Sequence, residues 1–358
     1  MRVLGIETSC DETSAAVVES DEFGRLTLCG QVVLSQIAKH APFGGVVPEI
    51  ACRSHVETLT RVIDQCLTES GTPPNSIDGI AVAHRPGLVG ALIIGVTTAK
   101  SLAWAWNKPL VGVHHLEAHL EAPRLTGTNV TPPYLGVVIS GGHTDLYRIE
   151  REGDAVSDPL LRKHLGGTQD DAIGEAFDKV SSILGLGYPG GPAIERTAKL
   201  GDPSAVSLPR TLLAPGSLDF SYSGIKTAVR YQWCGQDGRT GGPIPGAPKR
   251  EDLAASFQCA VVDVLIEKIA RALEQTGLER VLLGGGVTAN QYLRERVDRE
   301  LRVDGVAIRS KRRRRPLASE VVFPAREFST DNGAMIAALG WQRLARGESD
   351  GLNLDARP

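Results

Sequence analysis

Residues 3–18 read VLGIETSCDETSAAVV and contain an apolar strand, a polar turn and a second apolar strand. Residues 134–149 read YLGVVISGGHTDLYRI and repeat this arrangement, with the turn at residues 140–144. Small residues in each turn let backbone N–H groups approach an anion closely. Either turn alone is equally consistent with an ordinary hairpin. Together the two hairpins predict a duplicated α/β architecture, with one hairpin per lobe and phosphate held between the lobes.

Length and composition limit the classes of protein to consider. A chain of 358 residues exceeds the usual range of one hydrophobic core and predicts two lobes. Its net charge of −3 gives no global basic field that would indicate nucleic-acid binding. The first residues lack the apolar run of a signal peptide, and no run approaches about 18 apolar residues. The six scattered cysteines lack a CxxC pair, which favours reduced thiols and a cytoplasmic location.

Apolar residues near a 3.6-residue period predict a helix at 48–69, and a strong amphipathic helix is predicted at 253–276. A long apolar helix is predicted at 91–106 and a further helix at 291–301. In the first helix this period predicts the buried face as Ile50, Val56, Leu59, Val62, Ile63 and Leu67. The polar side chains between them are expected on solvated faces, and they are Glu49, Arg53, His55 and Glu57.

Three histidines lie in residues 111–120, VGVHHLEAHL. The apolar residues 109–113 predict the end of a strand, and the following LEAHLEA contains strong helix formers. On a helix His115 and His119 stand at i and i+4 on one face, where two imidazoles can share a divalent metal. The alternative for such a pair is two histidines on a helix surface. His114 points elsewhere, and we assign it no role.

Further turns predict contacts with a nucleotide. Residues 281–290, VLLGGGVTAN, are a buried strand that runs into a glycine-rich turn before a helix. This is a geometry of nucleotide contact, although the turn is not GxGxxG.

Asp170 or Asp171 is expected to cap the helix that follows them. Asp178 and Lys179 are interpreted either as a solvated pair or, for Asp178, as a carboxylate that accepts hydrogen bonds from a ribose.

Nine stretches along nearly the whole chain together resemble the tRNA N6-adenosine threonylcarbamoyltransferase family, once mislabelled as sialoglycoprotein endopeptidases. In chain order they are GIETSCDET at 5–13, PGLVGAL at 86–92, HHLEAH at 114–119, SGGHT at 140–144, GEAFDK at 174–179, YPGGP at 188–192, DFSYSGIK at 219–226, GGGVTAN at 284–290 and TDNGAM at 330–335. The length of the chain suits a bacterial or organellar member.

The resemblance implies an α/β fold of the actin/sugar-kinase/Hsp70-like (ASKHA) class, with two duplicated lobes and a nucleotide and metal cleft between them. Residues 1–115, completed by the C-terminal helix 333–346, are expected to form one lobe, and residues 116–332 the other. The implied reaction transfers the threonylcarbamoyl group from threonylcarbamoyl-AMP to N6 of adenosine 37 in tRNAs that read codons beginning with A, and AMP leaves.

The resemblance also implies roles for individual residues. His115, His119 and Asp331 match the family's metal ligands, for one divalent ion per subunit with Fe²⁺ preferred to Zn²⁺. The positions that match the family's substrate-binding residues are Val138, Ile139, Ser140, Gly141, Gly142, Asp178, Gly191 and Asn290. Glu12 is our candidate for a catalytic polar group at the reacting end of the donor, with ordering of its own loop as the alternative.

Partners follow from the same resemblance. It implies tRNA and threonylcarbamoyl-AMP as substrates, an ATPase partner, an inactive paralogue of the same fold, and no membrane. Inactive paralogues lack the metal-binding histidines, so His115 and His119 favour the active subunit. Residues 311–315 read KRRRR, a run that is usually a solvated loop. We predict that the stretch from Arg309 to Ser319, which contains this run, is an exposed loop that helps bind tRNA.

Two other enzyme classes are weighed against this reading. Zinc metalloproteases of the HExxH type place a general-base glutamate directly after the first histidine. Here Leu116 follows His115, and Glu117 lies one residue later, rotated by about 100° on a helix. An ATP-dependent sugar or acyl kinase of the same fold would not carry the family's tRNA-enzyme motifs. Both alternatives therefore rank below acyl transfer to tRNA.

Overall fold

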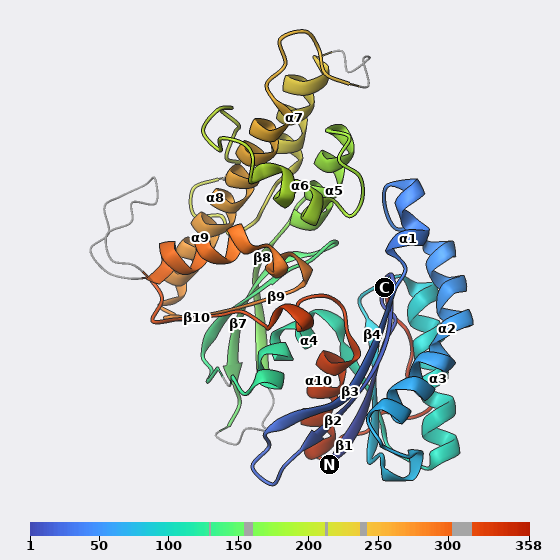
Figure 1. Cartoon of the computed structure of the whole chain (residues 1–358). Helices are drawn as coiled ribbons and strands as arrows, with labels where there is room; N and C mark the ends of the chain where they lie inside the picture. The colour runs from blue at the N-terminus through green and yellow to red at the C-terminus, as the bar shows by residue number, and fades with distance from the viewer. Residues whose placement is uncertain (129, 154–159, 212–213, 237–241, 303–316) are drawn as a thin grey trace. The chain divides into compact units, whose positions relative to one another are not determined.

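The structure is a computed structural model, and it describes residues 1–128, 130–153, 160–211, 214–236, 242–302 and 317–358 (Figure 1). The chain folds into two compact units. Unit 1 contains Met1–Asn129, Arg151–Leu160 and Pro324–Pro358, and unit 2 contains Val130–Glu150 and Leu161–Phe323. Each unit is built on its own five-stranded sheet.

The sheet of unit 1 has the strand order β3-β2-β1-β4-β5. Strand β1 (Arg2–Glu7) pairs antiparallel with β2 (Glu12–Ser20) and parallel with β4 (Gly79–Arg85). Strand β3 (Leu26–Ser35) continues the antiparallel side, and β5 (Leu110–His114) continues the parallel side. The hairpin predicted from residues 3–18 is thereby confirmed.

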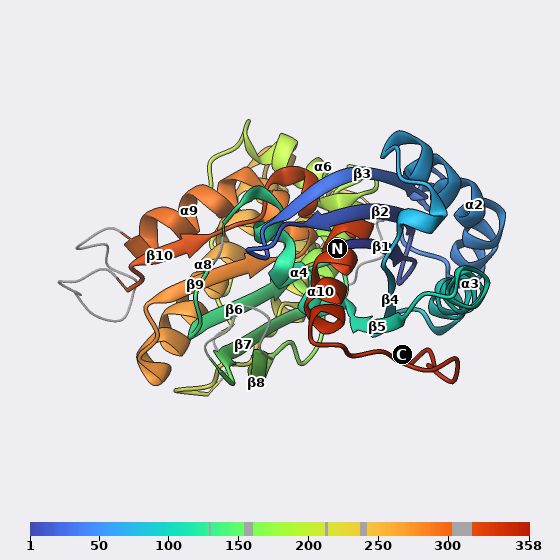
Figure 2. The same ribbon diagram turned by 90° about the horizontal axis from the view of Figure 1, so that it is seen from below.

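Helices cover both faces of this sheet. Side chains of β1 alternate between the faces: Val3 packs with α10 (Gly333–Ala345) on one face, and Leu4 and Ile6 pack with α2 (Pro48–Glu69) and α3 (Val89–Trp106) on the other. Figure 2 shows α10 on one side of β1–β5 and the pair α2 and α3 on the other. Burial on both faces explains why the middle residues of β1, β2 and β4 are apolar.

Two short helices and four 3-10 turns complete the regular structure described for unit 1. Helix α1 (Ile37–His40) follows β3, and α4 (His115–Glu121) follows β5 directly. Single 3-10 turns lie at Ala41–Phe43, Pro74–Ser76, Ala122–Thr126 and Arg326–Phe328.

The sheet of unit 2 has the order β10-β9-β6-β7-β8. Strand β6 (Tyr134–Ile139) pairs antiparallel with β7 (Thr144–Arg151) and parallel with β9 (Arg280–Gly284). Strand β8 (Leu160–Gly167) lies beside β7, and β10 (Glu320–Val322) pairs parallel with β9. The second hairpin predicted from the sequence is therefore also present, and it stands at the same place in its sheet as the first.

One hydrophobic core holds unit 2 together. The long helix α8 (Arg250–Thr276) contributes many of its side chains, and α7 (Ser223–Cys234) adds Ile225, Val229 and Trp233. The remaining helices are α5 (Ile173–Ile183), α6 (Gly190–Ala198) and α9 (Gln291–Arg302), with a 3-10 turn at Gly286–Ala289 before α9. The helices predicted at 253–276 and 291–301 correspond to α8 and α9.

The boundaries of the units differ from those we expected. The break lies after Asn129 instead of residue 115, because α4 packs on α10 and so belongs to unit 1. The return to unit 1 begins at Pro324 instead of residue 333, and Asp331 therefore lies in unit 1 with His115 and His119.

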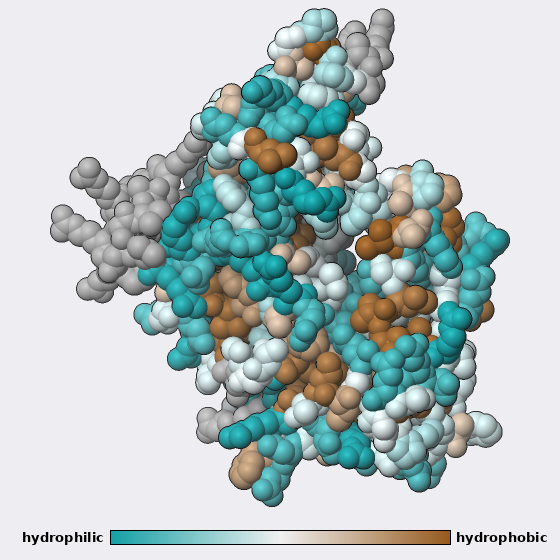
Figure 3. Space-filling model, viewed as in Figure 1, coloured by the Kyte–Doolittle hydropathy of each residue, from teal (hydrophilic) through white to brown (hydrophobic). Residues whose placement is uncertain are grey.

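Helix α3 is the one described helix that is long and apolar enough to cross a membrane by length and composition, with 33% of its window buried. Such a single helix is weak support for a membrane span, because core helices of soluble proteins pass the same test. It packs on β4 and α2. Apolar side chains are exposed over the helices of unit 1 in Figure 3, and Val56, Val89 and Ile93 are among the exposed apolar residues of α2 and α3.

The basic run at residues 311–315 lies outside the described residues. Its predicted role in binding tRNA stays a prediction.

Candidate functional site

The histidine pair lies where a strand gives way directly to a helix. Strand β5 ends at His114 and α4 begins at His115, so His115 and His119 occupy the first and fifth positions of α4. The predicted helical spacing is confirmed. Both side chains are buried, His119 completely, and their ring centroids lie 4.8 Å apart. The pair is therefore not a surface feature of the helix.

Asp331 reaches the histidines because α10 packs unusually close to the first hairpin. A Cβ atom on Gly5 would lie 2.1 Å from the carbonyl oxygen of Gly333, and one on Gly333 would lie 2.7 Å from the Ala16 nitrogen. The Gly333 N–H also donates to Ser14 Oγ at 2.9 Å. These glycines let the start of α10 lie against β1 and β2, and Asp331 precedes Gly333 by two residues.

The three side chains converge on a common point. Asp331 Oδ1 lies 3.4 Å from His115 Nε2 and 3.1 Å from His119 Nε2. One ligand atom from each of the three residues lies within 4.8 Å of the others. Ligand atoms about 2.1 Å from a tetrahedral ion stand about 3.4 Å apart. The spacing therefore fits three ligands of one divalent metal.

His119 supplies a second test of this fit. Its ring is fully buried, yet neither ring nitrogen has a hydrogen-bond partner among the described residues. The 3.1 Å approach of Nε2 to Asp331 is an ion-pair distance that lacks the geometry of a hydrogen bond. A buried polar group without a partner costs stability, and in native proteins it points to a strained or functional site. A metal on Nε2 would satisfy this nitrogen.

Charges around the cluster favour a cation. Burial opposes protonation of His115, but the carboxylates of Asp331 and Glu7 raise its pKa well above the ordinary value. Burial also disfavours the charged form of Asp331, but His115 and His119 hold the pKa of this carboxyl far below its usual range. Burial lowers the pKa of His119 in spite of Asp331. The two carboxylates thus favour positive charge at the position of His115.

Glu7, at the end of β1, holds the outer side of His115. Its Oε2 lies 2.9 Å from His115 Nδ1, and the Ser9 hydroxyl lies 3.1 Å from the same nitrogen. Glu7 is completely buried and also accepts a hydrogen bond from the Ser9 backbone. Sequence reasoning did not single out Glu7. The available signal was a carboxylate directly after a fully apolar strand.

Glu12, the first residue of β2, also lies in unit 1. Burial raises the pKa of its carboxyl well above the ordinary value, and the charges of Asp331 and Asp11 raise it further. Its Oε1 accepts from the Ser35 hydroxyl at 3.5 Å. The charge of Asp331 thus acts on Glu12, and the proposed catalytic role of Glu12 stays a prediction.

In unit 2 the SGGHT turn is held by the start of α5. The Gly174 and Glu175 N–H groups donate to the Ser140 and Gly141 carbonyls, each at 3.1 Å. A Cβ atom on Gly174 would lie 2.7 Å from Gly141 Cα, so only glycine allows this approach. Val138 and Ile139 are buried within β6, whereas a Cβ atom on Gly141 or Gly142 would meet open space. The two glycines of the turn therefore face open space, and their predicted contact with substrate stays a prediction.

Of the other predicted substrate positions in unit 2, Gly191 and Asn290 stand at helix starts, and Asp178 lies within α5. Asp178 Oδ1 accepts from the Gly190 N–H at 2.7 Å, where α6 begins, and a Cβ atom on Gly191 would meet open space. Asn290 Oδ1 accepts from Leu293 N and so caps α9, while its Nδ2 donates to Gln258. Asn290 is therefore already engaged as a helix cap.

The expected roles of Asp170, Asp171 and Lys179 are wrong. Ala172 is the N-cap of α5. Asp170 instead accepts from the backbone of Tyr222 and Ser223 at the start of α7. Asp171 accepts from Lys179 and Lys226, each at 2.6 Å, so Lys179 is not half of a solvated pair with Asp178.

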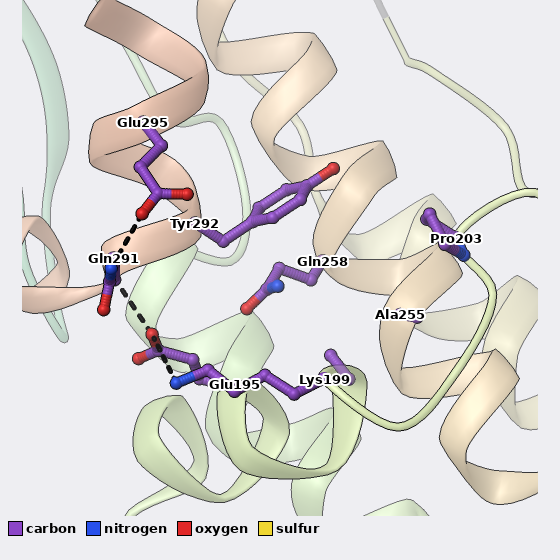
Figure 4. Close-up of a pocket in the computed structure, with 9 residues that line it drawn as sticks. Glu195, Lys199, Pro203, Ala255, Gln258, Gln291, Tyr292 and Glu295 are labelled. Atoms are coloured by element: carbon purple, nitrogen blue, oxygen red, sulfur yellow. Dashed lines mark hydrogen bonds and ion pairs between the residues drawn. The ribbon is translucent and has the colours of Figure 1, made fainter.

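A pocket of about 270 Å³ lies beside Asn290 in unit 2. Glu195 and Lys199 from α6, Gln258 from α8, and Gln291 and Tyr292 from α9 line it (Figure 4). Gln291 N donates to Glu195 Oε1 at 3.1 Å across one side of the pocket. Gln258, the partner of Asn290, points toward the same space in Figure 4. The pocket therefore adjoins a predicted substrate residue.

A second buried histidine pair in unit 1 was missed. His55 was expected on a solvated face of α2, but it is completely buried. Its Nδ1 bonds to the Thr13 hydroxyl at 2.8 Å and its Nε2 to the Cys10 carbonyl at 2.9 Å. His40 is also completely buried, with Nδ1 accepting from Val47 N and Nε2 facing Gln36 Oε1. The expectation failed because the buried face of α2 contains polar side chains.

The sequence was compared with known proteins. The profile of the family described as tRNA N6-adenosine threonylcarbamoyltransferase matches residues 27–338. A protein of that name from Anaeromyxobacter dehalogenans strain 2CP-C is 47% identical over 100% of this chain and 98% of its own length. Another, from Trichlorobacter lovleyi, is 48% identical over 99% of this chain and 95% of its own length.

Two solved structures of low sequence identity indicate the fold of this chain and carry no conclusion about its function. The (R)-2-hydroxyglutaryl-CoA dehydratase component A of Acidaminococcus fermentans superposes with a TM-score of 0.53 at 13% identity, covering 97% of this chain and 99% of its own. Full-length HypF superposes with a TM-score of 0.56 at 14% identity, covering 96% of this chain and 55% of its own. The expected actin/sugar-kinase/Hsp70-like fold is thereby confirmed.

Proposed function

The chain belongs to the tRNA N6-adenosine threonylcarbamoyltransferase family, and from this premise we propose the details of its reaction. The donor is threonylcarbamoyl-AMP, and the acceptor is N6 of adenosine 37 in tRNAs that read codons beginning with A. AMP leaves. The observation that carries the proposal is the buried cluster of His115, His119 and Asp331. These residues match the family's metal ligands, and their ligand atoms lie close enough together to hold one ion.

We propose that this cluster holds one divalent metal, Fe²⁺ in preference to Zn²⁺. Two neutral imidazoles and one carboxylate leave a divalent ion with net positive charge and open positions. When bound, such an ion supplies Lewis-acid polarisation of donor oxygens. The orphaned nitrogens of His119 and the spacing of the three ligand atoms support this assignment.

The chain itself has mainly to position the reactants. The donor is a mixed anhydride that is already activated, so no covalent nucleophile from the protein is required. N6 of the adenosine must lie about 3–3.5 Å from the carbamoyl carbon, and developing negative charge must be met by fixed donors. Glu12 is our candidate at the reacting end. Burial and the charges of Asp331 and Asp11 raise the pKa of its carboxyl, which favours the protonated form of this group.

We propose that residues of unit 2 bind the adenylate. We propose that backbone at Val138–Gly142 contacts the donor, where Gly141 and Gly142 leave open space. Asp178, Gly191 and Asn290 are proposed for the AMP portion. Asn290 bonds to Gln258 and precedes Gln291, and both of these neighbours line the pocket of Figure 4.

We further propose that the chain acts in the cytoplasm with an ATPase partner and an inactive paralogue of the same fold. Exposed apolar side chains on α2 and α3 support a protein partner, because such patches mark interaction sites in many proteins. The basic run at residues 311–315 is proposed to help bind tRNA.

Reconstitution tests the proposal. The chain, its partner proteins, unmodified tRNA and threonylcarbamoyl-AMP are incubated, and nucleosides are then analysed for threonylcarbamoyladenosine. We expect product with the wild type and a loss of at least about 100-fold with His115→Ala. The control His164→Ala, which changes an exposed histidine of β8, should retain activity. No product from the wild type, with His115→Ala equally silent, would refute the assignment.

A further inference from the structure

Glu7 approaches His115 in a way that fixes which ring nitrogen carries hydrogen. A carboxylate can only accept hydrogen bonds, so the 2.9 Å contact with Nδ1 requires a hydrogen on Nδ1. The Ser9 hydroxyl, 3.1 Å from the same nitrogen, can share that hydrogen as a second acceptor. Nε2 is then the nitrogen left to face Asp331.

Burial and hydrogen bonds hold the Glu7 carboxylate in this position. It is the last residue of β1 and is completely buried, and its Oε1 is bound by the Ser9 N–H. One carboxylate oxygen thus orders the first turn and the other holds the imidazole. A histidine that donates its outer N–H to a carboxylate is fixed in orientation and is a more basic ligand.

We infer that Glu7 is a positioning residue for the metal centre, whose carboxylate holds His115 with Nδ1–H outward and Nε2 toward the ion. This inference rests on the proposed metal site. His119 offers a contrast, because neither of its ring nitrogens has a hydrogen-bond partner among the described residues. Among the described residues the two ligands therefore differ: a hydrogen bond to Glu7 orients His115, whereas His119 has an ion-pair contact with Asp331 and no hydrogen bond.

Zinc affinity of the full chain, measured by competition with a chelator, tests the inference. We expect Glu7→Gln to weaken Zn²⁺ binding 10- to 100-fold, the usual effect of losing an outer carboxylate, and Glu7→Asp to recover part of the loss. The matched control is Glu121→Gln, which neutralises another buried carboxylate, on α4 itself, bound to Arg124 and Gln342. This control should stay within about threefold of the wild type.

Unchanged zinc affinity in folded Glu7→Gln would overturn the inference while leaving the metal site intact. Equal binding by wild type and His115→Ala would overturn the metal site and, with it, the role of Glu7. A second measurement needs no variant: the ring ¹⁵N shifts of His115 in the zinc-loaded wild type should report hydrogen on Nδ1. An unprotonated Nδ1 would contradict the assignment even if Glu7→Gln fails to fold.

Discussion

Unit 1 buries two pairs of histidines, and the pairs differ in how their nitrogens are satisfied. In His40 and His55 every ring nitrogen faces a hydrogen-bond partner from within the chain. In His115 and His119 the inner nitrogens face one carboxylate, and His119 has no hydrogen bond among the described residues. The first pair is satisfied as folded, whereas in the second pair the inner nitrogen of His119 has no hydrogen-bond partner among the described residues and would be satisfied by a cation.

This difference separates a structural role from a ligand role better than burial does. Both pairs are buried and both lie on or beside helices, so neither burial nor spacing distinguishes them. Hydrogen bonding distinguishes them because an unsatisfied buried nitrogen costs free energy unless something binds it. The predictions below test this contrast, from the largest expected effect to the smallest.

Removing a ligand should have the largest effect. We expect His119→Ala to weaken Zn²⁺ or Fe²⁺ binding at least about 1000-fold, equivalent to about 4 kcal/mol. His55→Gln should leave metal affinity within about threefold of the wild type. Chelator competition measures both. Similar losses in the two variants would show that the pairs do not differ in role.

Replacing a histidine of the hydrogen-bonded pair should lower the free energy of unfolding rather than the metal affinity. In His55→Leu the Cys10 carbonyl and the Thr13 hydroxyl lose their bonds to His55 in a buried site, and Thr13 keeps only its bond from the Thr58 hydroxyl. We expect a loss of about 2–3 kcal/mol in the free energy of unfolding of the metal-free chain. His119→Ala, which removes a group without hydrogen bonds, should cost less. Urea denaturation measures both, and a larger loss in His119→Ala would reverse the comparison.

Metal should stabilise only the chain that can bind it. Free metal at ten times its Kd adds about 1.4 kcal/mol to the free energy of unfolding. We expect this gain in the wild type and in His55→Gln, measured as an upward shift of Tm. His119→Ala serves as the control without a site, and an equal shift there would place the bound metal elsewhere.

The smallest expected effect concerns pH. Burial lowers the pKa of His55, so the unfolded chain binds a proton that the folded chain does not. The resulting stability is fully present above the ordinary histidine pKa of about 6.5 and is lost as pH falls through the lower folded pKa. One proton contributes less than about 1.4 kcal/mol per pH unit. This part of the acid slope should disappear in His55→Gln, and an identical slope would contradict the assignment.

Much of the fold could be predicted because its determinants are local. The two hairpins follow from short apolar runs around polar turns, and α8 and α9 follow from their period. The buried face of α2 was only partly predictable: Leu59, Val62 and Ile63 are buried as expected, but Val56 is exposed, and Ser54, His55 and Thr58 are buried in its place. Hydropathy cannot identify a face whose polar residues bond to distant loops.

The site shows the same division between local and distant information. The spacing of His115 and His119 is set within one short segment, and this segment is helical as predicted. Asp331 joins them only because Gly5 and Gly333 allow α10 to approach the first hairpin, and the sequence indicated this ligand through family resemblance alone. Glu7 had neither a motif spacing nor a matched role, so its contact with His115 required the structure.

Anomalous diffraction from crystals grown with Zn²⁺ tests the central claim most directly, because it locates the ion. We predict one ion per chain about 2.0–2.2 Å from His115 Nε2, His119 Nε2 and a carboxylate oxygen of Asp331. An ion bound by His40 or His55, or no ion at the cluster of His115, His119 and Asp331, would contradict the account.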